Sequence, residues 1–412
     1  MAPSKPLAGL RGAHWVESAL PDDLKTSVHS LTTVDGAGVT GYLFRRGGER
    51  TVACLMHPRE VLASHYLVPK LLAAGTAVWV QGSRMVGNDL RLEHELAVLD
   101  VDAGTAFLKS RGYEQLVLVG NSGGASLFVY YTEQANLAPE ARERQTPGGR
   151  PVKLTEAPMW RPDLLVLVAP HPGQGILLMN NLDPSVTDED DPLSVDPALF
   201  PFSAENGFAA GGANYSADFI VKYRAAQRAR VERIDARARQ MLARRMAARK
   251  ALKDGGGDDA QRLTAGWQHI FTVPRTDADL RNWDLSIDPT DRKIGSLWGN
   301  DPFKTNMSAA GFGKVCTPES WLSTWSGLSS RAAIERCAPA ITQPTLVIEY
   351  TGDACVFPEE LGRMFAALGT ADKALFTAKG NHHGQPMEAG EPLAQDLVGA
   401  AIADWLAPRM RA

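Results

Sequence analysis

The sequence lacks long apolar runs and has few cysteines, and both absences narrow the class of protein. No uninterrupted apolar stretch reaches the roughly 18 residues that a membrane-spanning helix needs. The first residues also have no apolar core of signal-peptide length. The four cysteines are widely spaced and form no CxxC pair, as is typical of thiols in a reducing compartment. We therefore expect a cytoplasmic protein with no membrane partner.

An excess of positive charge is also missing. The formal net charge is −4, whereas a domain dedicated to nucleic acid is normally basic. Hydrophobic residues make up 44% and charged residues 22% of the chain, which is ordinary for a globular protein. The 412 residues therefore fit one large decorated domain or two domains of usual size, with no nucleic-acid partner.

What is present is an alternation of short apolar runs with longer segments of helical spacing. After a predicted strand pair over residues 27–46, the apolar runs cover residues 51–56, 77–80, 116–119, 164–169, 345–350 and, more weakly, 374–377. The segments with helical spacing cover residues 61–74, 90–111 and 393–406. Continuously apolar strands that alternate with helices are typical of an α/β protein with a mostly parallel sheet flanked by helices.

A long insertion interrupts this alternation. Residues 171–339 contain no clear parallel-strand signal, so we predict a core over residues 25–170 and 340–412 with a mainly helical segment between. Residues 217–254 keep three- and four-residue apolar spacing and predict one long amphipathic helix that ends at Gly255. Its 12 Lys/Arg against four Asp/Glu favour a solvated helix face over a nucleic-acid patch, because the rest of the chain is acidic.

The most informative motif is a G-x-S-x-G pattern formed by Gly120, Ser122 and Gly124, placed after a buried-type strand and before a helix. A serine at such a sharp turn is strained and exposed, and the flanking positions need glycine because a Cβ would collide with the neighbouring strand and helix. At this point the sequence resembles the α/β-hydrolase family. The resemblance implies an α/β-hydrolase core with a large helical cap inserted before the penultimate core strand, a nucleophilic serine, and no cofactor.

The family pattern also implies an acid after a later strand and a histidine near the end of the chain. Asp353 follows the predicted strand at 345–350, and the pair His382-His383 follows the one at 374–377. We therefore predict a catalytic triad of Ser122, Asp353 and His382. Imidazole titrates near neutrality and can take the serine proton, while the carboxylate orients the ring. Two adjacent histidines cannot both face Ser122; the Gly-containing turn favours His382 and leaves His383 as an alternative base or pocket residue.

Acyl transfer also needs hydrogen-bond donors for the developing oxyanion. One predicted donor is the backbone N–H of Gly123, directly after the nucleophile. The second would come from the loop Met56-His57-Pro58-Arg59, where family members often carry His-Gly-x. Proline has no N–H, so alignment with that pattern points to the Arg59 amide.

Four further residues are predicted to line a substrate pocket: His57, Asn121, His171 and His383. His171 follows a strand and so lies at the carboxyl edge of the sheet, where open α/β sheets bind ligands. His57 lacks the HExxH spacing of a metal site, so no metal is predicted. Five of the nine tryptophans fall in the insertion, and we expect most in its core and one or two at the pocket.

These observations predict a serine hydrolase that acts on a carboxylic ester with a bulky, apolar or aromatic group. Leaving-group preference depends on pocket shape, so three enzymatic alternatives stay open: an amidase, a thioesterase, and a carbon–carbon bond hydrolase of a diketone-like ring-cleavage product. An alternative from another class is a binding protein for a hydrophobic ligand. The predicted partner is a small-molecule acyl substrate, and the long helix could also serve a homodimer.

Overall fold

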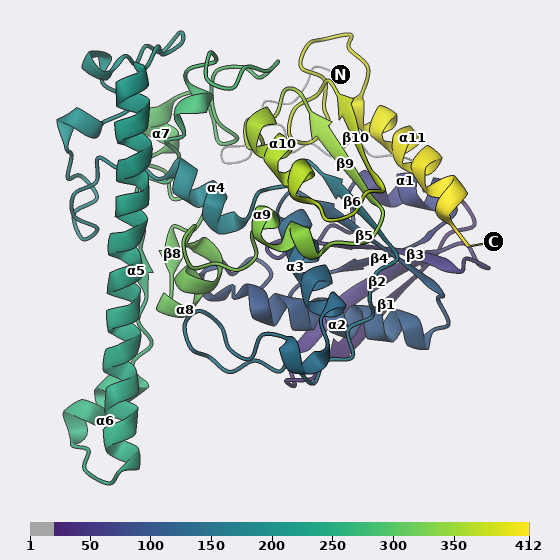
Figure 1. Cartoon of the computed structure of the whole chain (residues 1–412), viewed down its shortest axis with the longest axis horizontal. Helices are drawn as coiled ribbons and strands as arrows, with labels where there is room; N and C mark the ends of the chain where they lie inside the picture. The colour runs from purple at the N-terminus through teal and green to yellow at the C-terminus, as the bar shows by residue number, and fades with distance from the viewer. Residues whose placement is uncertain (1–19, 412) are drawn as a thin grey trace.

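The computed structural model describes residues 20–411, which are built around one eight-stranded sheet in the order β1-β2-β4-β3-β5-β6-β9-β10 (Figure 1). The strands are β1 (Lys25–Thr32), β2 (Gly38–Arg45), β3 (Thr51–Met56), β4 (Ala77–Gln81), β5 (Gln115–Asn121), β6 (Leu164–Val168), β9 (Thr345–Tyr350) and β10 (Lys373–Ala378). The β1–β2 and β2–β4 pairs are antiparallel, and every other neighbouring pair in this sheet is parallel. The predicted α/β class, a mostly parallel sheet flanked by helices, is confirmed.

Strand alternation divides the apolar core between the two faces of the sheet. On β3, Val52, Cys54 and Met56 face one cluster, while Ala53 and Leu55 face the other. The first face is covered by α2 (His94–Ser110), α3 (Gly123–Asn136) and α10 (Pro358–Ala367), and the second by α1 (Leu67–Ala73) and α11 (Ala394–Leu406). Covering both faces explains why the central strands are buried along their whole length.

Two helices begin later than their apolar spacing predicts. α1 begins at Leu67 rather than near residue 61, because the His65 ring accepts the Leu67 N–H at 3.2 Å and Leu62 turns instead toward a cavity. α2 begins at His94 rather than near residue 90. The carbonyl of Leu92 accepts a hydrogen bond from Thr324, in the insertion, at 2.7 Å. A local contact of His65 therefore stands before α1, and a tertiary contact with the insertion stands before α2.

The segment between β6 and β9 holds the remaining elements. They are α4 (Gln174–Asn181), α5 (Ala217–Lys253), α6 (Asp259–Gly266), β7 (Phe271–Thr272), α7 (Pro302–Thr305), β8 (Val315–Cys316), α8 (Pro318–Ser320), a π-helical turn at Trp321–Trp325, and α9 (Ile334–Cys337), with short 3-10 turns between some of them. α5 stands along one side of the molecule, and α6 packs beside its C-terminal end (Figure 1). Among the described residues, no helix is both long and apolar enough to cross a bilayer.

The expectation that the positive charge of α5 forms a solvated face is only partly correct. Arg230 is fully buried and forms two short hydrogen bonds to Glu189, at 2.8 and 2.7 Å. Arg245 is also buried and pairs with Glu319 on α8. Because each arginine binds a carboxylate from another part of the insertion, α5 is the element around which that segment is organised.

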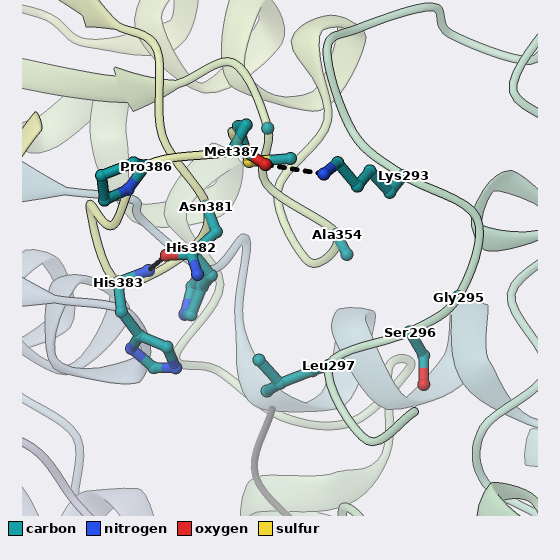
Figure 2. A pocket seen from close by; sticks show the side chains of 11 residues that line it. Lys293, Gly295, Ser296, Leu297, Ala354, Asn381, His382, His383, Pro386 and Met387 are labelled. Atoms are coloured by element: carbon teal, nitrogen blue, oxygen red, sulfur yellow. Dashed lines mark hydrogen bonds between the residues drawn. The ribbon is translucent and has the colours of Figure 1, made fainter. Parts of the chain in front are cut away.

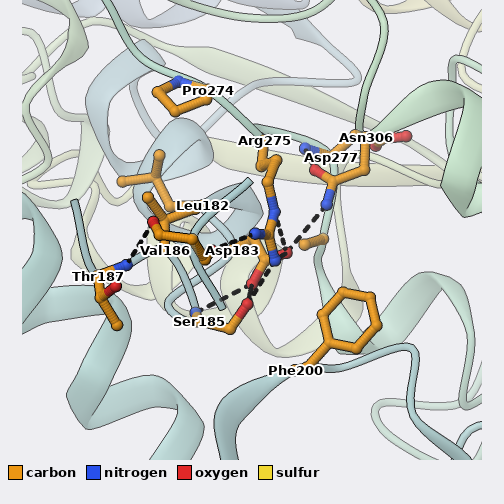
Figure 3. A network of polar contacts seen from close by, with 12 residues as sticks. Leu182, Asp183, Ser185, Val186, Thr187, Phe200, Pro274, Arg275, Asp277 and Asn306 are labelled. Atoms are coloured by element: carbon orange, nitrogen blue, oxygen red, sulfur yellow. Dashed lines mark hydrogen bonds and ion pairs between the residues drawn. The ribbon is translucent and has the colours of Figure 1, made fainter. Parts of the chain in front are cut away.

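A third buried ion pair ties the insertion together, between Asp183 and Arg275 (Figure 3). Arg275 donates from Nε to Asp183 Oδ2 at 2.9 Å, and Asn306 Nδ2 donates to the same oxygen at 3.0 Å. Ser185 donates to the other carboxylate oxygen at 2.7 Å. Removing one partner from a satisfied buried network leaves an uncompensated charge, which is costly.

We therefore expect Arg275→Met to lower the free energy of unfolding by roughly 3 kcal/mol or more, because Asp183 loses its cation while it stays buried. Thermal and urea unfolding followed by circular dichroism measure the change. Arg262→Met is the matched control: it removes an arginine from an exposed pair with Asp259 in the same insertion, and a change below about 1 kcal/mol is expected there. Equal effects in the two variants would contradict the structural role of the Asp183–Arg275 pair.

Glu95 links the core to the insertion and makes stability depend on pH. It is fully buried in α2 and accepts a hydrogen bond from Ser323 at 2.5 Å, while burial raises the pKa of its carboxyl to about 7. The folded state therefore favours the protonated acid, and the stability that this group contributes is lost as pH rises toward and through 7.

Glu95→Gln imitates the protonated side chain and removes this titration. Relative to the wild type, we expect the variant to gain about 2 kcal/mol of stability between pH 5.5 and pH 8.5. Urea unfolding at the two pH values measures the gain, and exposed Glu140→Gln provides the control. A difference between variant and wild type that does not change with pH would refute the buried titration.

Candidate active site

Ser122 lies at the turn between β5 and α3 with the backbone angles φ +55° and ψ −124°. Few non-glycine residues adopt a positive φ, and such strain persists only where surrounding structure enforces it. Here the Ser122 N–H donates to the Val168 carbonyl at 2.9 Å, and the Ser122 carbonyl accepts from Ala125 N at 3.1 Å. The turn is thereby fixed to β6 on one side and to α3 on the other.

The flanking glycines are required by close backbone approach. A Cβ on Gly120 would lie 2.5 Å from Ala125 Cα and 2.7 Å from Ala125 N, inside the helix. A Cβ on Gly124 would collide with the carbonyl oxygen of Met56 at the end of β3. The sequence motif therefore reflects two collisions, one with the helix and one with the neighbouring strand.

The structure brings Ser122, His382 and Asp353 into one hydrogen-bonded chain. His382 Nε2 lies 3.1 Å from Ser122 Oγ, and His382 Nδ1 lies 2.7 Å from Asp353 Oδ2. Asp353 is 1% exposed and His382 4%, so these two side chains are shielded from bulk water. This is the arrangement in which a carboxylate fixes the imidazole tautomer and the imidazole accepts a proton from the serine.

Asp353 is held by its second oxygen. The N–H groups of Cys355 and Val356 donate to Asp353 Oδ1 at 2.7 and 3.2 Å, which leaves Oδ2 for His382. The bond from His382 Nδ1–H to this carboxylate leaves Nε2 without a proton and turned toward Ser122.

His383 lies elsewhere. Its N–H donates to Asn381 Oδ1 at 2.9 Å, and its ring meets the His382 ring edge-on at a centroid distance of 5.1 Å. Burial, with a smaller contribution from the charge of His382, lowers the pKa of His383 to about 3, which keeps the ring neutral. The structure therefore brings His382 to Ser122 and leaves His383 at the cavity wall.

The loop that was predicted to supply a second oxyanion donor contains a contact between the Arg59 backbone and the His57 ring. The Arg59 N–H donates to His57 Nδ1 at 3.2 Å, so this predicted oxyanion donor is already engaged. With Nδ1 accepting, the proton of a neutral His57 resides on Nε2, and burial lowers the pKa of His57 well below its usual range. That nitrogen lies beside Gly123, 2.8 Å from where a Cβ of Gly123 would stand.

A cavity of about 290 Å³ opens on Ser122. All four predicted pocket residues line it: His57, Asn121, His171 and His383. The insertion contributes an apolar wall of Leu297, Trp298 and Phe312.

The tryptophans of the insertion lie in different environments. Trp298 lines this cavity, whereas Trp283, Trp321 and Trp325 are buried in the apolar clusters of the insertion and Trp267 is 62% exposed.

A second cavity of about 270 Å³ adjoins the first, since His382, His383 and Leu297 line both (Figure 2). Its far rim carries Lys293, whose Nζ donates to the Met387 carbonyl at 2.6 Å (Figure 2). The imidazole of His382 thus stands between two spaces, each large enough for part of a substrate.

Arg59 supports the wall of the first cavity through its side chain. It donates to both Asp89 oxygens, at 2.8 and 2.6 Å, and its guanidinium lies 5.3 Å from the ring of Phe312 and 5.5 Å from that of Trp325. A planar bidentate pair between two aromatic rings is a fixed arrangement.

Among the described residues, one group has ligand atoms close enough to hold a metal ion: His171, Cys355 and His382, within 4.8 Å of one another. Both nitrogens of His382 already bond to Ser122 and Asp353, and His171 Nε2 lies 3.0 Å from Ser122 Oγ. The nitrogens of this group therefore belong to the serine site.

Comparison with known proteins rests on structure. No protein-family model matches the chain, and no curated protein matches it in sequence. The structure of DcsB in complex with a substrate analogue is similar to it at a TM-score of 0.51 and 12% identity, over 94% of this chain and 99% of that one. Together with the sheet order and the strained serine turn, this likeness decides the fold. The chain has an α/β-hydrolase fold.

Two other solved structures resemble this α/β-hydrolase-fold chain less closely. The esterase Pf2001 of Pyrococcus furiosus has a TM-score of 0.46 at 12% identity and covers 98% of this chain and 99% of its own. The α/β hydrolase GrgF of Penicillium sp. sh18 has the same TM-score and identity, over 94% of this chain and 99% of its own.

Several residues of the site carry no sequence signal that would have revealed them. Cys355 reaches the triad only because it follows Asp353 by two residues, and Gln174 contacts Gly123 from the start of α4. Asp89 joins the site through a bond to Arg59 that spans 30 positions. Long-range pairs of this kind cannot be read from local spacing.

The strained turn at Ser122 makes a direct prediction about Gly120. Gly120→Ala places a methyl group in the backbone of α3, so we expect a clear loss of thermal stability together with loss of reactivity at Ser122. Gly362→Ala on α10 is the control, because its Cβ would meet no atom within 4 Å; there we expect a gain of up to about 1 kcal/mol. Calorimetry and active-site labelling read both effects, and a Gly120→Ala protein with wild-type stability and labelling would contradict the collision.

Proposed function

We propose that this protein is a serine hydrolase that cleaves a carboxylic ester with a bulky apolar or aromatic group. The observation that carries the proposal is the hydrogen-bonded chain from Ser122 through His382 to Asp353. Serine is unreactive at neutral pH unless a base takes its proton, and this chain supplies both the base and the group that orients it.

In the proposed reaction, Ser122 Oγ attacks the ester carbonyl while His382 Nε2 accepts the hydroxyl proton. The protonated His382 then gives this proton to the leaving alcohol, and an acyl group remains on Ser122. A water molecule then gives one proton to His382 while its oxygen bonds to the acyl carbon. The carbon–Oγ bond breaks, the proton returns from His382 to Ser122 Oγ, and the carboxylic acid leaves. Asp353 remains ionised and stabilises the imidazolium in both halves of the cycle.

The oxyanion would be held at the N-terminus of α3. The Gly123 N–H is one donor, at a helix end whose dipole favours negative charge. We assign the second donor to His57 Nε2–H in place of the predicted Arg59 amide, because that amide is bonded to His57 Nδ1. A neutral imidazole fixed in this tautomer is a preorganised donor and needs no rearrangement during the reaction.

The substrate class follows from the walls of the cavity. Leu62, Leu297, Trp298 and Phe312 present apolar surface next to Ser122, which suits an aliphatic or aromatic group. The second cavity on the other side of His382 would take the remaining part of the ester. In this proposal the insertion acts as a cap, because it supplies most of the apolar wall.

Fluorophosphonate labelling followed by intact-mass measurement tests the nucleophile. We expect the wild type to gain one adduct and Ser122→Ala to gain none, with hydrolysis of a p-nitrophenyl ester reduced by about 10⁴-fold or more. Ser126→Ala is the matched control, since Ser126 is buried on α3 and bonds to the Gly123 carbonyl rather than to the triad. Its labelling is expected to stay at the wild-type rate.

Equal hydrolysis by wild type and Ser122→Ala would refute the proposal. A panel of an aryl ester, a thioester and an anilide with the same acyl group then ranks the bond types. Fastest turnover of the ester is expected; fastest turnover of the thioester or anilide would retain the nucleophile and reassign the substrate. A folded wild type that binds apolar esters without cleaving or labelling would indicate a ligand-binding protein instead.

A further inference from the structure

The nucleophile contacts two imidazoles. Besides His382 at 3.1 Å, His171 Nε2 lies 3.0 Å from Ser122 Oγ. His171 follows β6, is 2% exposed, and is fixed by its own N–H, which donates to the Ser122 carbonyl at 3.2 Å. Its ring stacks on the His382 ring at a centroid distance of 5.1 Å and an angle of 22°.

The number of protons at this oxygen determines what His171 can do. Ser122 has one hydroxyl hydrogen, and His382 Nε2 accepts it because His382 Nδ1–H is committed to Asp353. His171 Nε2 can therefore bond to Oγ only as a donor, with its proton on Nε2. His171 Nδ1 is buried, and the Gln174 side chain bonds to this ring; an amide N–H can donate to a bare Nδ1.

His171 also stays neutral through the reaction. Burial, and next to it the charge of the adjacent His382, lower the pKa of His171 well below its usual range. When His382 becomes an imidazolium, a second cation stacked against it would be unfavourable. The His171 ring therefore neither gains nor loses a proton, and it differs in this from a general base.

We propose that His171 is a further catalytic residue: its Nε2–H donates a hydrogen bond to Ser122 Oγ and stabilises the negative charge that develops on that oxygen. This inference rests on the proposed hydrolase function. In acylation the hydroxyl proton passes to His382, and Oγ uses one electron pair to bond the carbonyl carbon. In deacylation the carbon–Oγ bond breaks, its electron pair stays on Oγ, and the proton of His382 returns there.

In both steps His171 keeps its own proton and His382 makes the transfer. The two imidazoles therefore have separate roles at one oxygen, with His382 as the base and His171 as a fixed donor. A hydrogen bond to a charged group is worth more than one to a neutral group, so the bond from His171 strengthens as charge builds on Oγ.

Stopped-flow kinetics with a p-nitrophenyl ester separates acylation from deacylation and tests the role. His171→Phe keeps an aromatic ring on His382 and removes the donor, so we expect both rate constants to fall roughly 10- to 100-fold. His171→Gln carries an amide N–H that can reach the position of Nε2 and is expected to recover most of the loss. His94→Phe is the matched control: it replaces another buried histidine and is expected to leave both rates unchanged.

Rates in folded His171→Phe equal to those of the wild type would overturn the inference, as would equal losses in His171→Phe and His171→Gln. If His171→Phe does not fold, His171→Gln is compared with His171→Asn. The shorter amide of Asn ends near the position of Nδ1 and cannot reach Oγ, so it must be the slower of the two; equal rates would again overturn the inference.

The labelling of Ser122→Ala and the kinetics of His171→Phe together distinguish this inference from the proposed function. If Ser122→Ala abolishes labelling while His171→Phe behaves as the wild type, the hydrolase stands and the role of His171 fails. If Ser122→Ala changes nothing, both fail together.

Discussion

The backbone strain at Ser122 is the constraint on which the rest of the site depends. A serine at φ +55° is held there by bonds to β6 and α3, and glycine on either side allows the helix and the strand to approach. This conformation places the N-terminus of α3 next to Oγ and lifts the side chain above the sheet edge. The histidines and the acid come to Oγ from other strands, so a relaxed turn would separate them all.

Parallel pairing then determines which residues meet at that oxygen. The carboxyl ends of β5, β6 and β9 lie side by side, so Ser122, His171 and Asp353 follow neighbouring strands. His382 arrives in the same way after β10, the next strand in the sheet. Four segments distant in sequence thus converge because they share one sheet edge, which is where open α/β sheets commonly bind ligands.

The insertion adds rigidity and an apolar wall. Its buried pairs, Arg230 with Glu189 and Arg275 with Asp183, join loops of the insertion to one another. Figure 3 shows the second pair. From this framework Trp298 and Phe312 extend to the cavity. The abundance of arginine in the insertion therefore has a structural cause, although part of α5 remains charged and exposed.

The sequence by itself determined the strands of the eight-stranded sheet, the bounds of the long helix, the class of the sheet, and the order of Ser122, Asp353 and His382 along the chain. These follow from local rules: apolar runs, helical spacing and the glycines of a tight turn. Only the tertiary structure decided that His382 rather than His383 meets Ser122, that His171 bonds to the same oxygen, and that the Arg59 amide is engaged by His57. Each of these depends on which side chains from separate segments fit within hydrogen-bonding distance, and local sequence spacing carries no information about that fit.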